Sequence, residues 1–214
     1  MKNCITALST SKAAMIVGIA FITSFFIVIL VDDFLLANFM VPGDNAALAR
    51  DIESNGCLFG FAVLGYLLVL TLDSIIGLAL YVVLKPANKN LALLTAVLRL
   101  LYACILISGL FVLVFQIIDA YGYASIKLLG YIFFALHIFV LGYSVLKSGY
   151  IPKSLGILLI VASFTYIVFF VDLHLPEILE VIIMLIMAIA ELSLSVWLIV
   201  KRNRLPKVIH FFHH

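Results

Sequence analysis

Six apolar segments, each about as long as a bilayer is thick, constrain most strongly what this chain can fold into. They lie at residues 13–31, 58–84, 91–118, 126–146, 154–171 and 178–200. A helix of roughly 20 apolar residues spans the hydrocarbon core, where every backbone polar group must find its hydrogen bond inside the protein. The sequence therefore predicts an all-α integral membrane bundle of six transmembrane helices, with the lipid bilayer as its first partner.

The composition excludes a soluble globular protein. Of the 214 residues 66% are hydrophobic and 11% charged, whereas about 25% charged is usual for soluble domains. We expect a single transmembrane domain over residues 1–207 and a disordered tail over 208–214. Between the first two helices, Asp44 is expected to begin a short helix that ends near Ser54, in a stretch interpreted as a surface connector rather than a lid.

Basic side chains gather at alternate connections between the segments. With the N-terminus inside, ten of the thirteen Lys and Arg residues fall on the cytoplasmic side and two fall outside, while nine of the eleven Asp and Glu residues fall outside or at the outer rim. The ten are Lys2, Lys12, Lys85, Lys89, Lys147, Lys153, Lys201, Arg202, Arg204 and Lys207. The positive-inside rule and the even number of helices then place both termini in the cytoplasm. Two lysines per turn are too few for a polybasic lipid cluster, and we predict no nucleic-acid partner.

Four ionisable residues remain inside the apolar segments at one depth. Asp73 is 12 residues before Lys85, Arg99 is 10 after Lys89, His137 is 10 before Lys147 and Glu191 is 10 before Lys201. At 1.5 Å per residue these separations are about 15–18 Å, near the middle of a core roughly 30 Å thick. We call these four residues the buried layer, and we expect Arg99 to bridge Asp73 and Glu191, with His137 as a further donor or acceptor.

Helical spacing adds polar side chains to the faces that carry the buried layer. The predicted ligand-binding residues are Asp73, Arg99, His137, Glu191, Tyr66, Tyr81, Tyr102 and Ser195. His137 is also the candidate catalytic residue. The three cysteines have no metal-ligand spacing, and we predict neither a metal nor a cofactor. The histidines near the C-terminus are assigned to the tail.

Several short motifs resemble a known family of membrane proteins. They are Leu136-His137, Leu141-Gly142-Tyr143, Lys147-Ser148-Gly149, Ile151-Pro152, Leu155-Gly156, Leu80-Tyr81 to Lys85-Pro86, Leu98-Arg99-Leu100 and Glu191 to Trp197. From Ala13 to Lys201 the chain resembles a multi-pass prokaryotic family catalogued as domain of unknown function 4386. Its pattern is matched at Arg99, His137, Gly142, Tyr143, Ser148, Gly149, Pro152, Gly156 and Glu191. The resemblance implies six helices in a prokaryotic cytoplasmic (inner) membrane, and it implies no activity.

Three functions remain open at this point. The favoured one is binding or translocation of a small ligand, ion or proton at the buried layer, since ionisable residues inside a membrane mark such sites. The second is an intramembrane enzyme with His137 as general base. The third is a structural or accessory subunit whose buried ion pairs only fix helix packing, with a homodimer or another membrane protein as partner. Whether the chain is an enzyme stays undecided.

Overall fold

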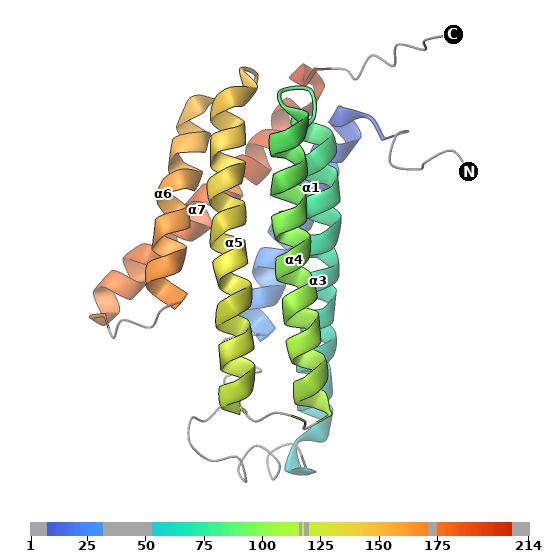
Figure 1. The fold of residues 1–214 in the computed structure, drawn as a ribbon, viewed down its shortest axis with the longest axis vertical. Helices are drawn as coiled ribbons and strands as arrows, with labels where there is room; N and C mark the ends of the chain where they lie inside the picture. Colours follow the sequence, from blue (N-terminus) through green and yellow to red (C-terminus); the bar gives the residue numbers. More distant parts are fainter. Residues whose placement is uncertain (1–7, 32–52, 116, 118–119, 171–174, 207–214) are drawn as a thin grey trace.

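Six long helices make up most of the chain that the structure describes (Figure 1). The computed structural model describes residues 8–31, 53–115, 117, 120–170 and 175–206. The helices are α1 (Thr10–Ile29), α3 (Gly56–Leu84), α4 (Lys89–Val114), α5 (Ala120–Ser148), α6 (Lys153–Phe170) and α7 (Glu177–Lys201), followed by the 3-10 turn η4 (Arg202–Arg204). Five of them are long and apolar enough to cross a membrane, and α6 is a shorter apolar helix. The predicted all-α, multi-pass membrane architecture is confirmed.

The helices pack as a closed ring in chain order. Each helix contacts the next one along the sequence, and α7 returns to contact α1. In Figure 1, α3, α4 and α5 run nearly parallel to the long axis, whereas α7 crosses the bundle obliquely. Thr10 Oγ1 donates to the Pro206 carbonyl at 2.7 Å, and Ser11 Oγ donates to Asn203 Oδ1 at 3.1 Å. The beginning of α1 and the residues after α7 therefore lie at one end of the bundle, as an even number of crossings requires.

A tight turn joins α3 to α4. The Ala87 N–H donates to the Leu84 carbonyl at 3.0 Å. Asn88 then caps α4, because its side-chain oxygen accepts hydrogen bonds from the N–H groups of Asn90 and Leu91, each at 3.0 Å. Such a cap satisfies donors that have no partner inside the helix. The two helices are consequently antiparallel neighbours, with Lys85 and Lys89 at the turn.

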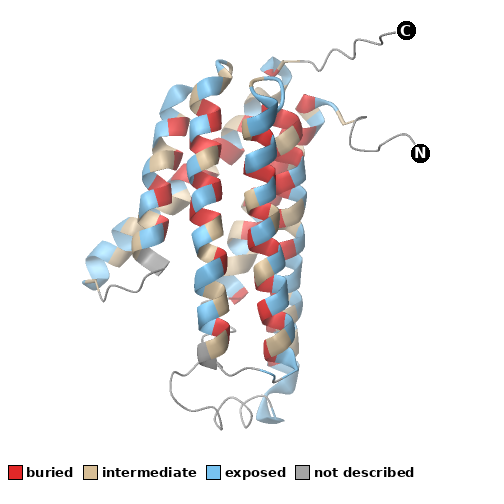
Figure 2. Cartoon of the chain, in the orientation of Figure 1, coloured by how far each residue is buried: buried red, intermediate tan, exposed pale blue. Residues whose placement is uncertain are grey.

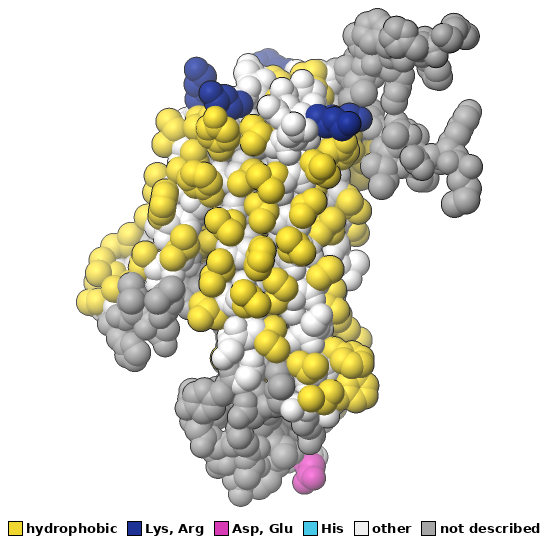
Figure 3. Space-filling view, in the orientation of Figure 1, with side chains coloured by type: hydrophobic (Ala, Val, Ile, Leu, Met, Phe, Trp, Pro, Cys, Tyr) yellow, Lys and Arg dark blue, Asp and Glu magenta, His cyan; other side chains and the backbone are white. Residues whose placement is uncertain are grey.

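The outside of the bundle is apolar and its buried residues face inward. Figure 2 shows buried positions recurring along the helices on the sides that face other helices. On the face drawn in Figure 3, hydrophobic side chains cover the middle and Lys and Arg side chains gather at the end that carries the α3–α4 turn. Exposed residues along the helices include Phe26, Leu64, Phe111, Phe164 and Ile189. This surface contacts lipid, because an apolar exterior of this extent does not suit water.

Some helix bounds differ from those expected. α4 ends at Val114 rather than near residue 118, and the Ile117 N–H donates to the Val112 carbonyl at 2.9 Å just beyond its end. α5 begins at Ala120, earlier than the predicted residue 126. The expected cap at Asp44 and the tail over 208–214 lie outside the described residues. The single-domain organisation stays a prediction.

Two glycines let α5 and α6 approach closely, so Gly142→Ala should destabilise the bundle. A Cβ on Gly142 would lie 2.8 Å from the Gly156 carbonyl oxygen. Because that atom belongs to the backbone, the helices must separate, and we expect a loss of about 1–3 kcal/mol in the free energy of unfolding. Denaturation in detergent micelles measures the loss. Gly60→Ala is the control, since nothing lies within 4 Å of a Cβ there; equal losses in both variants would contradict the close approach.

The turn between α5 and α6 is tied to the end of α3 by Tyr150, whose hydroxyl donates to the Val83 carbonyl at 2.7 Å. Burial raises the pKa of Tyr150 to about 12, above its ordinary value of about 10. The neutral hydroxyl therefore stabilises the fold fully below about pH 10, and this contribution is lost as the pH rises through about 12. Tyr150→Phe should cost about 0.5–1.5 kcal/mol at neutral pH. Unfolding measured against pH should show the two proteins converging above pH 10; a constant difference would contradict this role.

Candidate functional site

Arg99 lies in the middle of α4 with 1% of its surface exposed, and four side chains from other helices surround it. Its Nη2 forms an ion pair with Asp73 Oδ1 of α3, and its Nη1 lies 3.1 Å from His137 Nε2 of α5. The guanidinium carbon also lies 4.4 Å from the ring centroid of Phe21 and 5.2 Å from that of Phe134. Aromatic ring faces attract cations, more strongly where water is absent. We call Arg99, Asp73, His137, Phe21 and Phe134 the Arg99 cluster.

Hydrogen-bond partners on both ring nitrogens determine the state of His137. Its Nε2 faces a guanidinium N–H, which can only donate, so Nε2 must accept. Its Nδ1 lies 2.8 Å from the Thr95 carbonyl oxygen, which can only accept, so Nδ1 carries the hydrogen. His137 is therefore a neutral imidazole with its proton on Nδ1.

This assignment is open to direct measurement. Nitrogen-15 NMR of histidine-labelled protein should show His137 with a protonated Nδ1 and an unprotonated Nε2 at neutral pH. The signal is assigned by its loss in His137→Gln. His174, outside the described residues, would remain as an internal reference. A His137 signal with both nitrogens protonated would contradict the hydrogen-bond pattern.

Glu191 of α7 has a different partner from the expected one. Its Oε1 accepts a short hydrogen bond from the Tyr166 hydroxyl of α6. Both side chains are buried, with 9% of Glu191 and 8% of Tyr166 exposed. No hydrogen bond or ion pair joins Glu191 to Arg99 in the described part of the chain, so the expected bridge from Asp73 through Arg99 to Glu191 is not formed. We call Tyr166 and Glu191 the Glu191 pair.

Phe134 connects the Arg99 cluster with the Glu191 pair. Its ring centroid lies 5.9 Å from that of His137 and 5.1 Å from that of Tyr166, the second in an edge-to-face arrangement. Glu191 also interacts electrostatically with Arg99 and Asp73. Each of the six helices thus contributes a side chain to this region: Phe21, Asp73, Arg99, His137, Tyr166 and Glu191.

The remaining predicted site residues lie at different distances from this region. Tyr102 packs against Phe134 with centroids 4.7 Å apart, and Ser195 Oγ donates to the Glu191 backbone carbonyl at 2.7 Å. Tyr66 and Tyr81 lie seven residues before and eight after Asp73 on α3, or about 10 and 12 Å along its axis. The ammonium groups of Lys127 and Lys85 lie 5.9 and 5.7 Å from the ring centroids of Tyr66 and Tyr81, respectively.

Sequence reasoning missed both aromatic rings around Arg99. Phe134 carried a usable signal, because it precedes His137 by three residues and so shares its helix face. Phe21 carried none, since the faces of α1 hardly differ in hydrophobicity. Tyr166 lies in the fifth apolar segment, and its pairing with Glu191 follows only from the packing of α6 against α7.

The charges of this region do not cancel when both carboxylates are ionised. Arg99 is a permanent cation, and Asp73 neutralises it through their ion pair. With His137 neutral, one negative charge is left on Glu191, whose oxygen receives only a neutral hydroxyl. Among the described residues no three His, Cys, Asp or Glu side chains gather as a metal-ligand set.

Comparisons with known proteins find relatives of this chain. A family model described as "Domain of unknown function (DUF4386)" matches residues 16–119 and 112–201. An "Uncharacterized protein" of Archaeoglobus fulgidus is 36% identical over 149 residues, which are 70% of this chain and 88% of that protein. No solved structure matches. The two ranges matched by the family model contain all four residues of the buried layer.

Proposed function

The chain belongs to the family described as Domain of unknown function (DUF4386), and from its buried layer we propose that it binds a proton reversibly at Glu191 and translocates it across the membrane. This narrows the prediction of a layer that binds or translocates a small ligand, ion or proton. Arg99 and Asp73 form the fixed, neutral part of the layer. Glu191 is the part that changes its charge.

The observation that carries this proposal is the unmatched carboxylate of Glu191. An ionised side chain near the middle of a bilayer costs about 2.5–3.5 kcal/mol on insertion scales, and binding a proton removes that cost. The Tyr166 hydroxyl suits both states, because it donates to a carboxylate and can accept from a carboxylic acid. Glu191 can therefore gain and lose a proton without losing its partner.

His137 is a poorer proton acceptor in this geometry. A proton on Nε2 would make it a donor that faces the donor Nη1 of Arg99, 3.1 Å away. The Arg99–His137 hydrogen bond would break, and a buried guanidinium N–H would lose its acceptor, at a cost of about 1–3 kcal/mol or more. We therefore assign His137 the role of orienting Arg99.

Proton flux into vesicles tests translocation. The full chain is reconstituted into lipid vesicles that contain a pH-sensitive dye, and the outside is acidified. Vesicles with the wild type should acidify inside faster than protein-free vesicles, and vesicles with Glu191→Gln should not. Glutamine is chosen because its side-chain oxygen can still accept the hydrogen bond from Tyr166. Glu177→Gln, an exposed carboxylate at the start of the same helix, is the matched control and should conduct normally. Equal flux in wild type and Glu191→Gln would overturn translocation.

A second candidate function is a structural or accessory subunit. The observation that favours it is the placement of Arg99 between Phe21 and Phe134, together with its ion pair to Asp73. A guanidinium held in this way fixes the positions of α1, α3, α4 and α5. On this account Glu191 keeps one protonation state, no flux is seen, and a partner protein is recovered with the chain in stoichiometric amount.

An intramembrane enzyme with His137 as general base is the least favoured alternative. A general base needs a ring nitrogen that can reach the proton of a substrate. Both nitrogens of His137 already have partners, Arg99 and the Thr95 carbonyl. A substrate would therefore have to displace the Arg99 side chain first.

We further propose that residues 1–207 form one domain in a prokaryotic cytoplasmic membrane, with the basic end in the cytoplasm. Support comes from the archaeal relative and from the gathering of Lys and Arg at the end that holds the first turn of α1 and the last turn of α7 (Figure 3). When fused to the C-terminus, a reporter that works only in the cytoplasm should be active. Activity of a second reporter, one that works only outside the cytoplasm, would reverse this orientation. A homodimer remains a prediction.

A further inference from the structure

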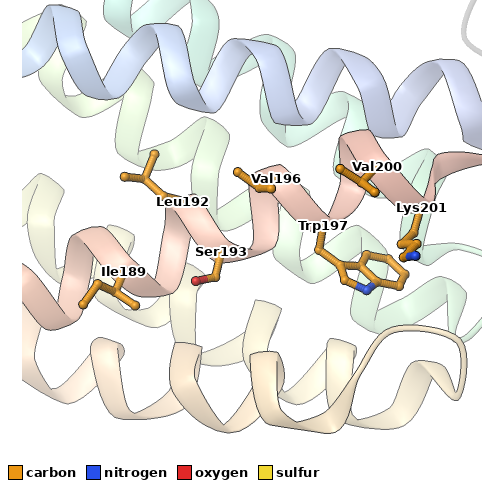
Figure 4. A pocket seen from close by; sticks show the side chains of 7 residues that line it. All are labelled: Ile189, Leu192, Ser193, Val196, Trp197, Val200 and Lys201. Atoms are coloured by element: carbon orange, nitrogen blue, oxygen red, sulfur yellow. The ribbon is translucent and has the colours of Figure 1, made fainter.

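A shallow, largely open groove runs along the outer face of α7. It has a volume of about 570 Å³ and is lined by Ile189, Leu192, Ser193, Val196, Trp197, Val200 and Lys201. Figure 4 shows these side chains along α7, between α1 on one side and the α5–α6 hairpin on the other. We call this hollow the α7 groove. Five of the seven lining residues are apolar, one is the hydroxyl-bearing Ser193, and the last is Lys201.

The α7 groove has the length and the polarity of a lipid chain with its headgroup. From Ile189 to Lys201 α7 rises about 18 Å, which is somewhat more than half of a hydrocarbon core roughly 30 Å thick. Ile189, Val196 and Val200 are more than half exposed. Ile189 lies at one end of the groove, and Trp197 and Lys201 lie toward the other end. Membrane proteins place tryptophan and lysine at the headgroup level. One end therefore suits an acyl chain and the other suits a polar group.

The charge at the lysine end selects an anionic headgroup. Lys201 belongs to the α7 groove, Arg204 lies exposed just beyond it, and Lys153 lies exposed at the beginning of α6, which packs against α7. No Asp or Glu of the described residues lies at this end of the bundle. A second copy of the chain in the same orientation would bring its own basic end toward Lys201, and like charges would oppose that contact.

We infer that the α7 groove binds one anionic glycerophospholipid, with an acyl chain along α7 and the phosphate at Lys201. This site goes beyond the proposed proton function and does not depend on it. The basic turns carry two lysines each, which are too few to form a polybasic lipid cluster. The lipid is therefore held by the shape of the α7 groove as well as by charge. The bound lipid would complete the outer surface of α7.

Trp197 provides a direct test because it is the sole tryptophan of the chain. The full chain is reconstituted in phosphatidylcholine vesicles in which a growing fraction is phosphatidylglycerol with brominated acyl chains, which quench nearby tryptophan. A parallel series contains brominated phosphatidylcholine. Half-maximal quenching should need about fivefold less brominated phosphatidylglycerol than brominated phosphatidylcholine. This ratio is the equivalent of about 1 kcal/mol for one basic side chain near the membrane surface. Equal quenching by both lipids would overturn the proposal.

Two variants separate the headgroup from the acyl chain. Lys201→Gln should remove the preference for phosphatidylglycerol, while Lys89→Gln, an exposed lysine at the same end but on α4, should keep it. Ser193→Phe should fill the α7 groove and reduce quenching by both brominated lipids. A preference that survives in Lys201→Gln would contradict the assigned headgroup contact. Trp197 fluorescence that neither lipid quenches would indicate a protein in the groove and would equally overturn the inference.

Discussion

Arg99→Met should destabilise the bundle by about 3–5 kcal/mol, because it leaves the Asp73 carboxylate buried without its cation. The substitution also removes the donor to His137 Nε2 and the cation between Phe21 and Phe134. Chemical unfolding in detergent micelles, followed by circular dichroism, measures the loss. Arg204→Met is the control, since Arg204 is exposed at the end of the bundle and should change stability little.

A double variant shows whether charge balance is the reason. Arg99→Met combined with Asp73→Leu removes both members of the ion pair, and an apolar replacement of a buried pair is often neutral or stabilising. The double variant should therefore recover most of the stability lost in Arg99→Met. A double variant as unstable as the single one would show that Arg99 acts through His137 and the two rings rather than through Asp73.

Phe134→Ala should be the second most damaging substitution, with a loss of about 3–5 kcal/mol in the free energy of unfolding. Phe134 is 8% exposed and packs against Arg99, Tyr102, His137 and Tyr166. Removing the ring opens a cavity between the Arg99 cluster and the Glu191 pair and takes away one aromatic face from the cation. The same unfolding measurement in micelles applies.

The matched control for this substitution lies on the same helix. Phe139 is 40% exposed and pairs with Phe164 at a centroid distance of 6.1 Å. Phe139→Ala removes the same atoms from a site that faces lipid, so its loss should be much smaller. Similar losses at Phe134 and Phe139 would mean that ring size matters and that the position of Phe134 between the two halves of the site does not.

The relative level of Asp73, Arg99 and His137 along the bundle could be predicted from the sequence because charged residues mark the ends of the helices. Counting from Lys85 and Lys89 places Asp73 and Arg99 at one level, and the structure joins them in an ion pair. The same counting places His137 correctly. The family resemblance, which rested on short motifs such as those around His137 and Gly142, is confirmed by the family match over the transmembrane segments.

Direction around the helix axis could not be predicted in the same way for α1 and α6. A soluble helix reveals its inner face by its apolar stripe, but the faces of α1 and α6 hardly differ in hydrophobicity. Phe21 was therefore indistinguishable from its neighbours. The oblique course of α7 (Figure 1) is also not encoded in any local pattern, and Glu191 of this helix contacts Tyr166 rather than Arg99.

The protonation of Glu191 in the folded protein is the central claim, and infrared difference spectroscopy measures it most directly. Reconstituted protein with carbon-13-labelled glutamate carboxyl groups is titrated from about pH 9 to about pH 4, a range that spans the ordinary carboxylate and imidazole pKa values. We predict one buried carboxylic-acid band that appears reversibly, is absent in Glu191→Gln and persists in Glu177→Gln. The account would be contradicted if the Glu191→Gln spectrum kept every carboxylic-acid band of the wild type at all pH values in this range.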